Sequence, residues 1–126
     1  MSEVEIEALA RRYFDAINTE NWDALRPLWR DDATFTAVGA KTRKGPDEIV
    51  ALFQKLFVPW AEHDDQPTRF ITQGTTTAVE VLFTGKTHDG RPVQFSAFDV
   101  IDAEDGQIRG LTNWYDIAHV RKILEG

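Results

Sequence analysis

The sequence contains no cysteine and only three histidines, His63, His88 and His119. Without cysteine the chain forms no disulfide, has no thiolate nucleophile and offers no ligand to a cysteine-bound zinc or iron–sulfur centre. The histidines lack the HExxH-type spacing of a helix-borne zinc site. We therefore expect neither a protein-bound metal nor another cofactor.

Basic residues are also scarce, because 14 Lys and Arg stand against 21 Asp and Glu, for a net charge of −7. A surface that follows phosphates needs clustered positive charge, so nucleic acid is not expected as a partner. No apolar run approaches the length of a membrane span, and the acidic segment 1–7 lacks the apolar core of a signal peptide. We expect a cytoplasmic protein that does not enter a membrane.

The chain does contain enough apolar material for one sizeable core. Its 126 residues are 42% hydrophobic and include four Trp, eight Phe and two Tyr. No repeat, low-complexity tract or linker divides them. We therefore expect a single domain over residues 1–126.

Three helices are predicted in the first half of the chain. Apolar residues at helical spacing indicate the first over residues 3–18. The second is short, capped by Asn21 and ended by Asp31-Asp32. The third opens at Pro46 and carries apolar residues as far as Trp60.

The second half reads as strands and turns, which makes the chain an α+β domain. Asp89-Gly90 and Asp105-Gly106 are hairpin signals, whereas 39–45 and 62–67 are predicted to be polar loops. A short helical tail is predicted over 119–124. β-branched and aromatic residues predict strands over 33–38, 70–77, 78–88, 93–101 and 107–116.

Asp99 is the most informative residue, because it interrupts the apolar face of a predicted strand. Side chains alternate along a strand, so Asp99 shares a face with Val93, Phe95, Ala97 and Ile101. A buried carboxylate without a partner is costly, and a raised pKa that keeps the proton avoids the cost. Such a carboxyl donates a hydrogen bond or exchanges a proton near neutral pH, as acid/base sites require.

The order of elements and five segments, 12–25, 31–35, 44–49, 98–101 and 105–108, together resemble one known family. This is the SnoaL-like branch of the nuclear-transport-factor-2-like superfamily, which also contains ketosteroid isomerases, polyketide cyclases and limonene-epoxide hydrolases. The resemblance spans nearly the whole chain and is specific for fold more than for function.

The resemblance implies a cone-shaped, curved antiparallel sheet wrapped around three helices. A pocket for an apolar small molecule is then expected between the concave face and the first and third helices. Many relatives are homodimers, and the outer face of the sheet, with Phe98 and Val100, suits a dimer contact.

Matched to ketosteroid isomerases, Tyr13 and Asp99 fall on the two residues that donate hydrogen bonds to the substrate oxyanion. The general base of those enzymes falls on Ala37, or on Val38 if the gap is placed differently, and neither accepts a proton. The epoxide-hydrolase match places Asn113 where a carboxylate works on the catalytic water. Polyketide cyclases fit best, because they use an Asp on this strand as acid/base.

Alternation on the last strand offers two candidate sets for the inner face, and the resemblance favours the set with Asn113 and Tyr115. These two side chains would supply hydrogen bonds and an aromatic wall. The first set is Arg109, Leu111, Asn113 and Tyr115, and the second is Ile108, Gly110, Thr112, Trp114 and Asp116. The predicted substrate-binding residues are Asn113, Tyr115, Phe53, Phe57, Trp60, Phe95 and Leu111.

Several polar residues outside this set are read as structural. His63, Asp64 and Asp65 are predicted to lie in a solvated acidic loop. The basic segment 41–44 is read as a surface loop, with an anionic ligand as the alternative. Asp116 caps the final helix or, if the strand register slips by one residue, acts as a base.

Two functions remain open at this stage. The first is an isomerase- or cyclase-type enzyme without cofactor that performs acid/base chemistry on an apolar carbonyl or ring substrate. Asp99 would be its acid or acid/base, and Tyr13 would stabilise an enolate-like oxygen. The second is a non-catalytic module of the same fold that binds a hydrophobic ligand or dimerises, which the missing base at Ala37 favours.

Overall fold

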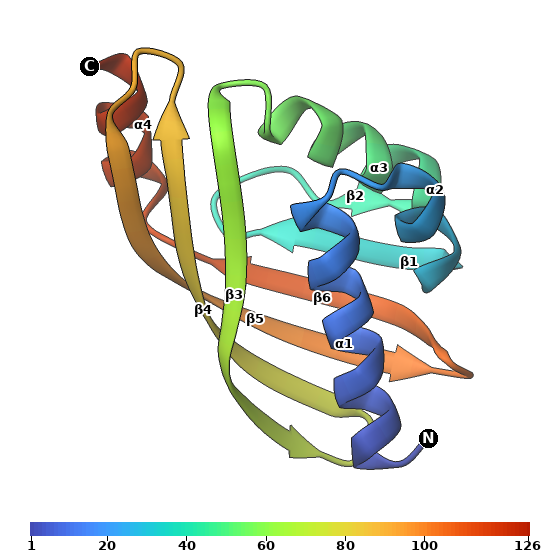
Figure 1. Ribbon diagram of the computed structural model, residues 1–126. Helices are drawn as coiled ribbons and strands as arrows, with labels where there is room; N and C mark the ends of the chain where they lie inside the picture. Colours follow the sequence, from blue (N-terminus) through green and yellow to red (C-terminus); the bar gives the residue numbers. More distant parts are fainter.

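A six-stranded curved sheet with four α-helices and one 3-10 turn makes up the fold, in a computed structural model that describes all 126 residues (Figure 1). The α+β class is confirmed, and none of the helices is long and apolar enough to cross a membrane. The elements are α1 (Glu3–Asn18), α2 (Trp22–Leu25), η1 (Arg26–Leu28), β1 (Trp29–Ala37), β2 (Arg43–Lys44), α3 (Gly45–Leu56), β3 (Trp60–Gln73), β4 (Thr76–Thr87), β5 (Pro92–Glu104), β6 (Gln107–Trp114) and α4 (Ile117–Glu125).

The strands are ordered β2-β1-β6-β5-β4-β3, so β3 forms one edge of the sheet and the short β2 forms the other. Neighbours are antiparallel except β1 and β6, which pair in parallel. The expected antiparallel sheet thus has one exception, because a long connection can return a strand alongside an earlier one in the same direction. Figure 1 shows α1 and α3 within the curve of the sheet, and α4 beside the turn between β4 and β5.

Helix α1 forms over the predicted residues. The Ser2 hydroxyl accepts from the Glu5 backbone N–H, and the Glu5 carboxylate accepts from the Ser2 N–H, each at 3.1 Å. This reciprocal capping fixes the start of the helix. Its apolar stripe, which includes Ile6, Leu9 and Tyr13, is buried. The periodicity therefore brings the Tyr13 ring into the interior.

The second and third helices are shorter than predicted. α2 keeps its Asn21 cap, but Asp31-Asp32 belong to β1, in an exposed stretch where the pairing with β6 is interrupted. α3 ends at Leu56 instead of reaching Trp60. Pro59 lacks the N–H that a continuing helix would need, and Trp60 is the first residue of β3.

The acidic segment 62–67 is part of a strand and not the predicted loop. It pairs with β4, and this pairing outweighs the low strand preference of its Asp and Pro residues. Pro67 is accommodated because β3 is an edge strand and its register shifts between Pro67 and Arg69. His63 and Asp65, two residues apart on the strand, therefore lie on the same face of β3, and both are partly buried.

The register of β5 and β6 decides which side chains face the helices. Asp99 pairs directly with Asn113, which places both side chains on one face. Near the start of β6 the register shifts, and Arg109 has no partner. Arg109 is consequently exposed while Ile108 is buried. Of the set predicted to face inward, Leu111 and Asn113 do so and Arg109 does not.

Helix α4 begins at Ile117, two residues before the predicted tail. Asp116 caps it by accepting from the His119 backbone N–H at 2.9 Å, so the capping role is confirmed. The last turn is tied to the end of the β4–β5 hairpin, because the Arg91 guanidinium donates to the Ile123 carbonyl at 2.6 Å.

The outer face of the sheet carries exposed aromatic residues. Phe98 and Trp114 are cross-strand partners and are 36% and 43% exposed. Val100 lies on the same face of β5 and is half-buried. Dimerisation through this face stays a prediction.

Gly85 on β4 lets an aromatic wall pack close to the sheet. A Cβ there would lie 2.8 Å from the Glu62 carbonyl oxygen and from two ring carbons of Phe83. The Phe83 ring stacks on Phe95 with a centroid distance of 4.5 Å and packs against Trp60 at 4.8 Å. The missing side chain at Gly85 is therefore what gives the Phe83 ring its room.

We expect Gly85→Ala to lower the free energy of unfolding by about 1–3 kcal/mol, since an over-packed site forces backbone and rings apart. Gly110→Ala is the matched control, because the nearest atom to its Cβ would be the Thr34 Oγ1 at 3.5 Å. For Gly110→Ala we expect the free energy of unfolding to change by less than about 1 kcal/mol. Urea unfolding measures both, and equal losses in the two variants would contradict the packing argument.

Candidate functional site

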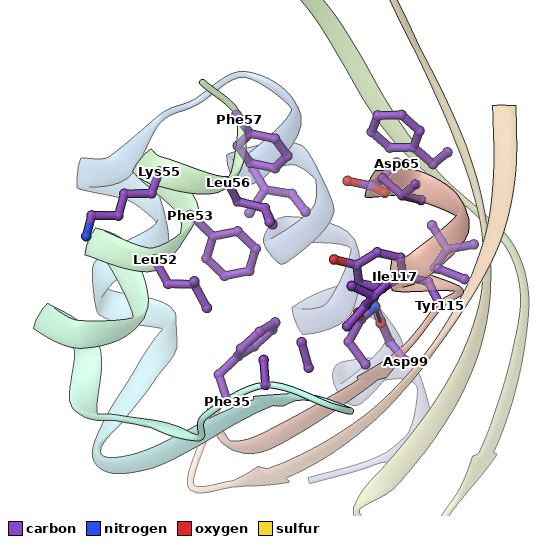
Figure 2. Close-up of a pocket in the computed structure, with 18 of the residues that line it drawn as sticks. Phe35, Leu52, Phe53, Lys55, Leu56, Phe57, Asp65, Asp99, Tyr115 and Ile117 are labelled. Atoms are coloured by element: carbon purple, nitrogen blue, oxygen red, sulfur yellow. Dashed lines mark hydrogen bonds between the residues drawn. The ribbon is translucent and has the colours of Figure 1, made fainter. Parts of the chain in front are cut away.

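A cavity of about 370 Å³ lies between the concave face of the sheet and the helices α1 and α3. Of its 27 lining residues, 19 are hydrophobic. Figure 2 shows Leu52 and Phe53 of α3, and Phe57 directly after it, on one side and Asp65 and Asp99 of the sheet on the other. The volume falls within the range of small-molecule sites in proteins.

Asp99 is the most deeply buried carboxyl of the cavity wall, with 3% of its surface exposed. The Asn113 Nδ2 donates a hydrogen bond of 2.6 Å to Asp99 Oδ1. Burial raises the pKa of Asp99 to about 7, and the hydrogen bond from Asn113 opposes this rise. Both protonation states of the carboxyl are therefore accessible near neutral pH.

Asp65 is a second carboxyl on the cavity wall, contributed by β3. Its backbone is held by the side chain of Asn18, which accepts from the Asp65 N–H at 2.7 Å and donates to the Asp65 carbonyl at 3.0 Å. These two bonds join the end of α1 to β3. Burial first, and then the negative charges of Asp99 and Asp64, raise the pKa of Asp65 to about 7.

Sequence reasoning assigned Asp65 to a solvated loop, and the structure corrects this. The sequence offers little signal, because residues 62–67 contain only polar side chains and a proline, and His63, Asp64 and Asp65 are all partly buried. Register shifts on both sides of this stretch, after Trp60 and after Pro67, break the pattern over any longer window. The strand therefore does not stand out in the sequence.

The Tyr13 phenol completes the polar part of the cavity. Its residue is 3% exposed and is part of the cavity wall, and no hydrogen bond contributes to its pKa. Burial, followed by the charges of Asp99 and Asp65, raises the pKa of Tyr13 well above its ordinary value. The phenol therefore keeps its proton and is a hydrogen-bond donor to whatever occupies the cavity.

Tyr13, Asp65 and Asp99 act on one another electrostatically. The charge of Asp99 raises the pKa of both other groups, and the charge of Asp65 raises that of Tyr13. The charge of one ionised carboxyl disfavours ionisation of the other, which favours a state with one proton on the pair. Such a pair is able to remove a proton from a bound molecule and return one.

The remaining residues predicted for the site have different positions. An aromatic row crosses the sheet side, because Phe83 stacks on Phe95 at 4.5 Å and Phe95 on Tyr115 at 5.7 Å. Leu111 is buried in the core and lies outside the cavity wall. The wall includes Phe53, Phe57, Trp60, Phe95, Asn113 and Tyr115 of the predicted set, and also Ala37.

The histidines lie outside the cavity wall. His63 is not solvated as predicted: its side chain is 5% exposed, its ring stacks on Phe57 at 3.8 Å, and its Nε2 lies 3.1 Å from a Glu20 carboxylate oxygen. His88 Nε2 donates to the Val58 carbonyl at 2.8 Å. No group of three or more His, Asp or Glu side chains could hold a metal ion.

The raised pKa of Asp99 makes stability depend on pH. Between its ordinary value of 3.8 and about 7, the folded state binds the proton more tightly than the unfolded chain, so stability is lost as pH rises through this window.

We expect Asp99→Asn to remove this loss of stability at high pH. Its free energy of unfolding should exceed that of the wild type by about 2–4 kcal/mol at pH 8 and match it within about 1 kcal/mol at pH 4. Urea unfolding at both pH values tests this, and a difference independent of pH would contradict it.

Similarity to known proteins agrees with this architecture. A family model described as the SnoaL-like domain matches residues 10–111. Among curated proteins, none is significantly similar to the chain in sequence.

Three solved structures illustrate the similarity. An NTF2-like protein from Burkholderia pseudomallei K96243 has a TM-score of 0.89 and 19% identity over 100% of both chains. A protein from Jannaschia Sp. CCS1, assigned to the SnoaL-like polyketide cyclases, has a TM-score of 0.89 and 16% identity over 98% of this chain and 94% of that chain. An LEH-like epoxide hydrolase from M. tuberculosis has a TM-score of 0.81 and 19% identity over 98% of this chain and 91% of that chain.

Identities this low show a shared fold, and they confirm the nuclear-transport-factor-2-like architecture expected from the sequence. The family model covers most of the residues from which the sheet and the cavity are built. The chain belongs to the SnoaL-like domain family.

Proposed function

We propose that this protein is a cofactor-independent acid/base enzyme of the isomerase or cyclase type that acts on an apolar carbonyl or ring substrate. The observation that carries the proposal is the convergence of Tyr13, Asp65 and Asp99 on one largely apolar cavity. Carboxyls with a pKa near 7 are suited to exchanging protons at neutral pH.

The two carboxyls take different roles in this proposal. Asp99 is the deeper group and holds the proton, whereas Asp65 is the carboxylate that removes a proton from the carbon next to the substrate carbonyl. The electron pair of that C–H bond moves into the carbonyl and leaves an enolate oxygen. Tyr13 and protonated Asp99 donate hydrogen bonds to this oxygen, which stabilises the charge that develops in the transition state.

The enolate then has two productive fates. If protonated Asp65 returns its proton to another carbon of the conjugated system, the net reaction is an isomerisation. If the enolate carbon attacks a second carbonyl of the same molecule, a ring closes and protonated Asp65 supplies the proton to the new alkoxide. In both cases the proton removed at the start is returned, so no external reductant, oxidant or cofactor is consumed.

The base missing from the isomerase position has a substitute in this scheme. Ala37 of β1 lines the cavity and accepts no proton. Asp65 enters the same cavity from the edge strand β3, which three strands separate from β1. The proposal therefore keeps the chemistry of a carboxylate base while moving its origin to another strand.

The second candidate is a module of the same fold that binds a hydrophobic ligand without reaction. It is favoured by Ala37 and by the 19 hydrophobic residues of the wall. The two candidates differ in one measurable property, because only the enzyme exchanges protons with the bound molecule.

We expect the protein to catalyse deuterium incorporation next to the carbonyl of cyclic ketones dissolved in D2O. Proton NMR measures this exchange for a panel of ketones such as 1-indanone, 2-tetralone and cyclohex-3-enone. Asp65→Asn and Asp99→Asn should each slow this exchange by about 10²–10⁴-fold, the usual contribution of a positioned acid or base. The rate should change with pH around 7, where both carboxyls titrate.

Asp64→Asn is the matched control for the exchange assay, because Asp64 neighbours Asp65 on β3 and is not part of the cavity wall. We expect it to keep most of the activity and to move the pH dependence to slightly lower pH, because the charge of Asp64 contributes to the raised pKa of Asp65. Exchange rates that are the same in the wild type, Asp65→Asn and Asp99→Asn would refute the acid/base assignment. Binding of these ketones without any exchange would favour the binding module.

Tyr13→Phe should slow the same exchange by about 10–10³-fold, because it removes one donor to the enolate oxygen. We expect stability to change by less than about 1 kcal/mol, since no hydrogen bond contributes to the pKa of the hydroxyl and the ring is retained. A large loss of stability in urea unfolding, with unchanged exchange, would mean that the phenol is structural.

A further inference from the structure

Positive charge is concentrated around the cavity, although the protein as a whole is acidic. The wall contains four of the 14 basic side chains but only two of the 21 acidic ones, Asp65 and Asp99. Both of these carboxyls are partly protonated at neutral pH. The cavity therefore carries a local positive charge within a protein whose net charge is −7.

Three of the basic side chains come from two segments that meet at the cavity. Lys41 and Arg43 belong to the loop and strand that follow β1, and Arg121 belongs to α4. The segments lie close together, because a Cβ added at Gly39 would be within 3.7 Å of the Ile117 side chain. We call Lys41, Arg43 and Arg121 the cationic rim.

The fourth basic residue, Lys55, is not counted in the rim. Figure 2 shows its side chain extending from α3 away from the cavity and from the two carboxyls. Only the stem of Lys55 is therefore placed to contribute to the wall.

The cationic rim has no acidic partner inside the protein. Arg26, Arg30, Arg69, Arg91 and Arg109 each form a salt bridge, whereas none of the three rim residues lies within 4.0 Å of a carboxylate oxygen. The Arg43 guanidinium donates to the Lys41 carbonyl, a bond that leaves its charge unpaired. The rim charges remain free for a ligand.

The rim and the carboxyl pair lie at different parts of the cavity. No rim residue is among the groups that shift the pKa of Asp65 or Asp99, whereas Arg121 does act on Tyr115. Lys41 and Arg121 are exposed, and Asp99 is 3% exposed. The cavity thus has a buried acid/base end and a solvent-facing cationic end.

We propose that the ligand of this protein is amphiphilic, with an apolar ring body and a carboxylate or phosphate group that binds the cationic rim. The inference rests on the proposed function for the buried end, where the carbonyl would meet Asp99, and on the rim itself for the other end. The anionic group fixes the direction of entry, so the uncharged part of the ligand reaches the carboxyl pair. The rim also attracts the anion while the acidic remainder of the surface repels it.

The test uses two fluorescent probes of the same aromatic skeleton. 8-Anilinonaphthalene-1-sulfonate is anionic, N-phenyl-1-naphthylamine is neutral, and both become fluorescent in an apolar site. We expect the wild type to bind the anionic probe more tightly, and its affinity to fall as salt is raised from about 0.01 to 0.5 M. The double variant Arg43→Gln/Arg121→Gln should lower the affinity for the anionic probe by about tenfold. Its affinity for the neutral probe should fall by less than about twofold.

The matched control is Lys44→Gln/Lys122→Gln, which removes the same charge from the next residue in each segment. Neither Lys44 nor Lys122 is part of the cavity wall. We expect this control to change both affinities by less than about twofold. The proposal would be overturned if both double variants lost the same affinity for the anionic probe. It would also be overturned if Arg43→Gln/Arg121→Gln lost the same affinity for the anionic and the neutral probe. Displacement of the anionic probe by 2-naphthoate or by 2-naphthyl phosphate then distinguishes a carboxylate ligand from a phosphate ester.

Asp65→Asn and Asp99→Asn separate this inference from the proposed function when titrated with the same probes. We expect both to keep the preference for the anionic probe. If Arg43→Gln/Arg121→Gln loses affinity for the anionic probe but the wild type catalyses no deuterium exchange, the acid/base function is refuted and the anion site at the rim stands. If exchange depends on the two carboxyls but the rim substitutions leave probe affinity unchanged, only the anion site is refuted.

Discussion

The hydrogen bond from Asn113 to Asp99 joins the chemistry of the cavity to the register of the sheet. The 2.6 Å bond links direct cross-strand partners of β5 and β6. A slip of one residue would turn Asp99 to the outer face and bring Phe98 into the cavity. The unpaired Arg109 absorbs a change of register near the start of β6, so Ile108 stays in the core while Asn113 stays opposite Asp99. The position of the buried carboxyl therefore depends on the correct pairing of the strands.

Helix α1 arranges the other half of the polar cluster. It carries Tyr13 on its buried face, and its last residue, Asn18, holds both backbone groups of Asp65. Two of the three polar groups in the cavity thus take their positions from one helix, whose start is fixed by its capping box. The distance between phenol and carboxyl then depends on the docking of a rigid element and not on a flexible loop.

Local signals in the sequence were enough for part of this picture. Asp99 was found because alternation persists over a regular strand, and the span of α1 and the turn at Asp105-Gly106 follow from periodicity and turn chemistry. Asp65 was missed because its strand is rich in charge, contains Pro67 and is interrupted by shifts of register. Arg109 was misassigned because one unpaired residue reverses the alternation. In both cases the deciding interaction is pairing with a distant segment, which no local pattern encodes.

The position of β3 at the edge of the sheet affects how such a site evolves. An edge strand is bonded to one neighbour only, and the irregular pairing at Pro67 shows that β3 tolerates residues without a partner. Insertion or deletion of two residues in β3 keeps every side chain on the same face of the sheet. It moves a carboxyl by about 7 Å along the cavity wall. The central strands, with Asp99 and Asn113, are untouched by such a change. One architecture thereby has a physical route to cavities of different shape, because a carboxyl on the edge strand is relocated while the buried Asp99 stays in place.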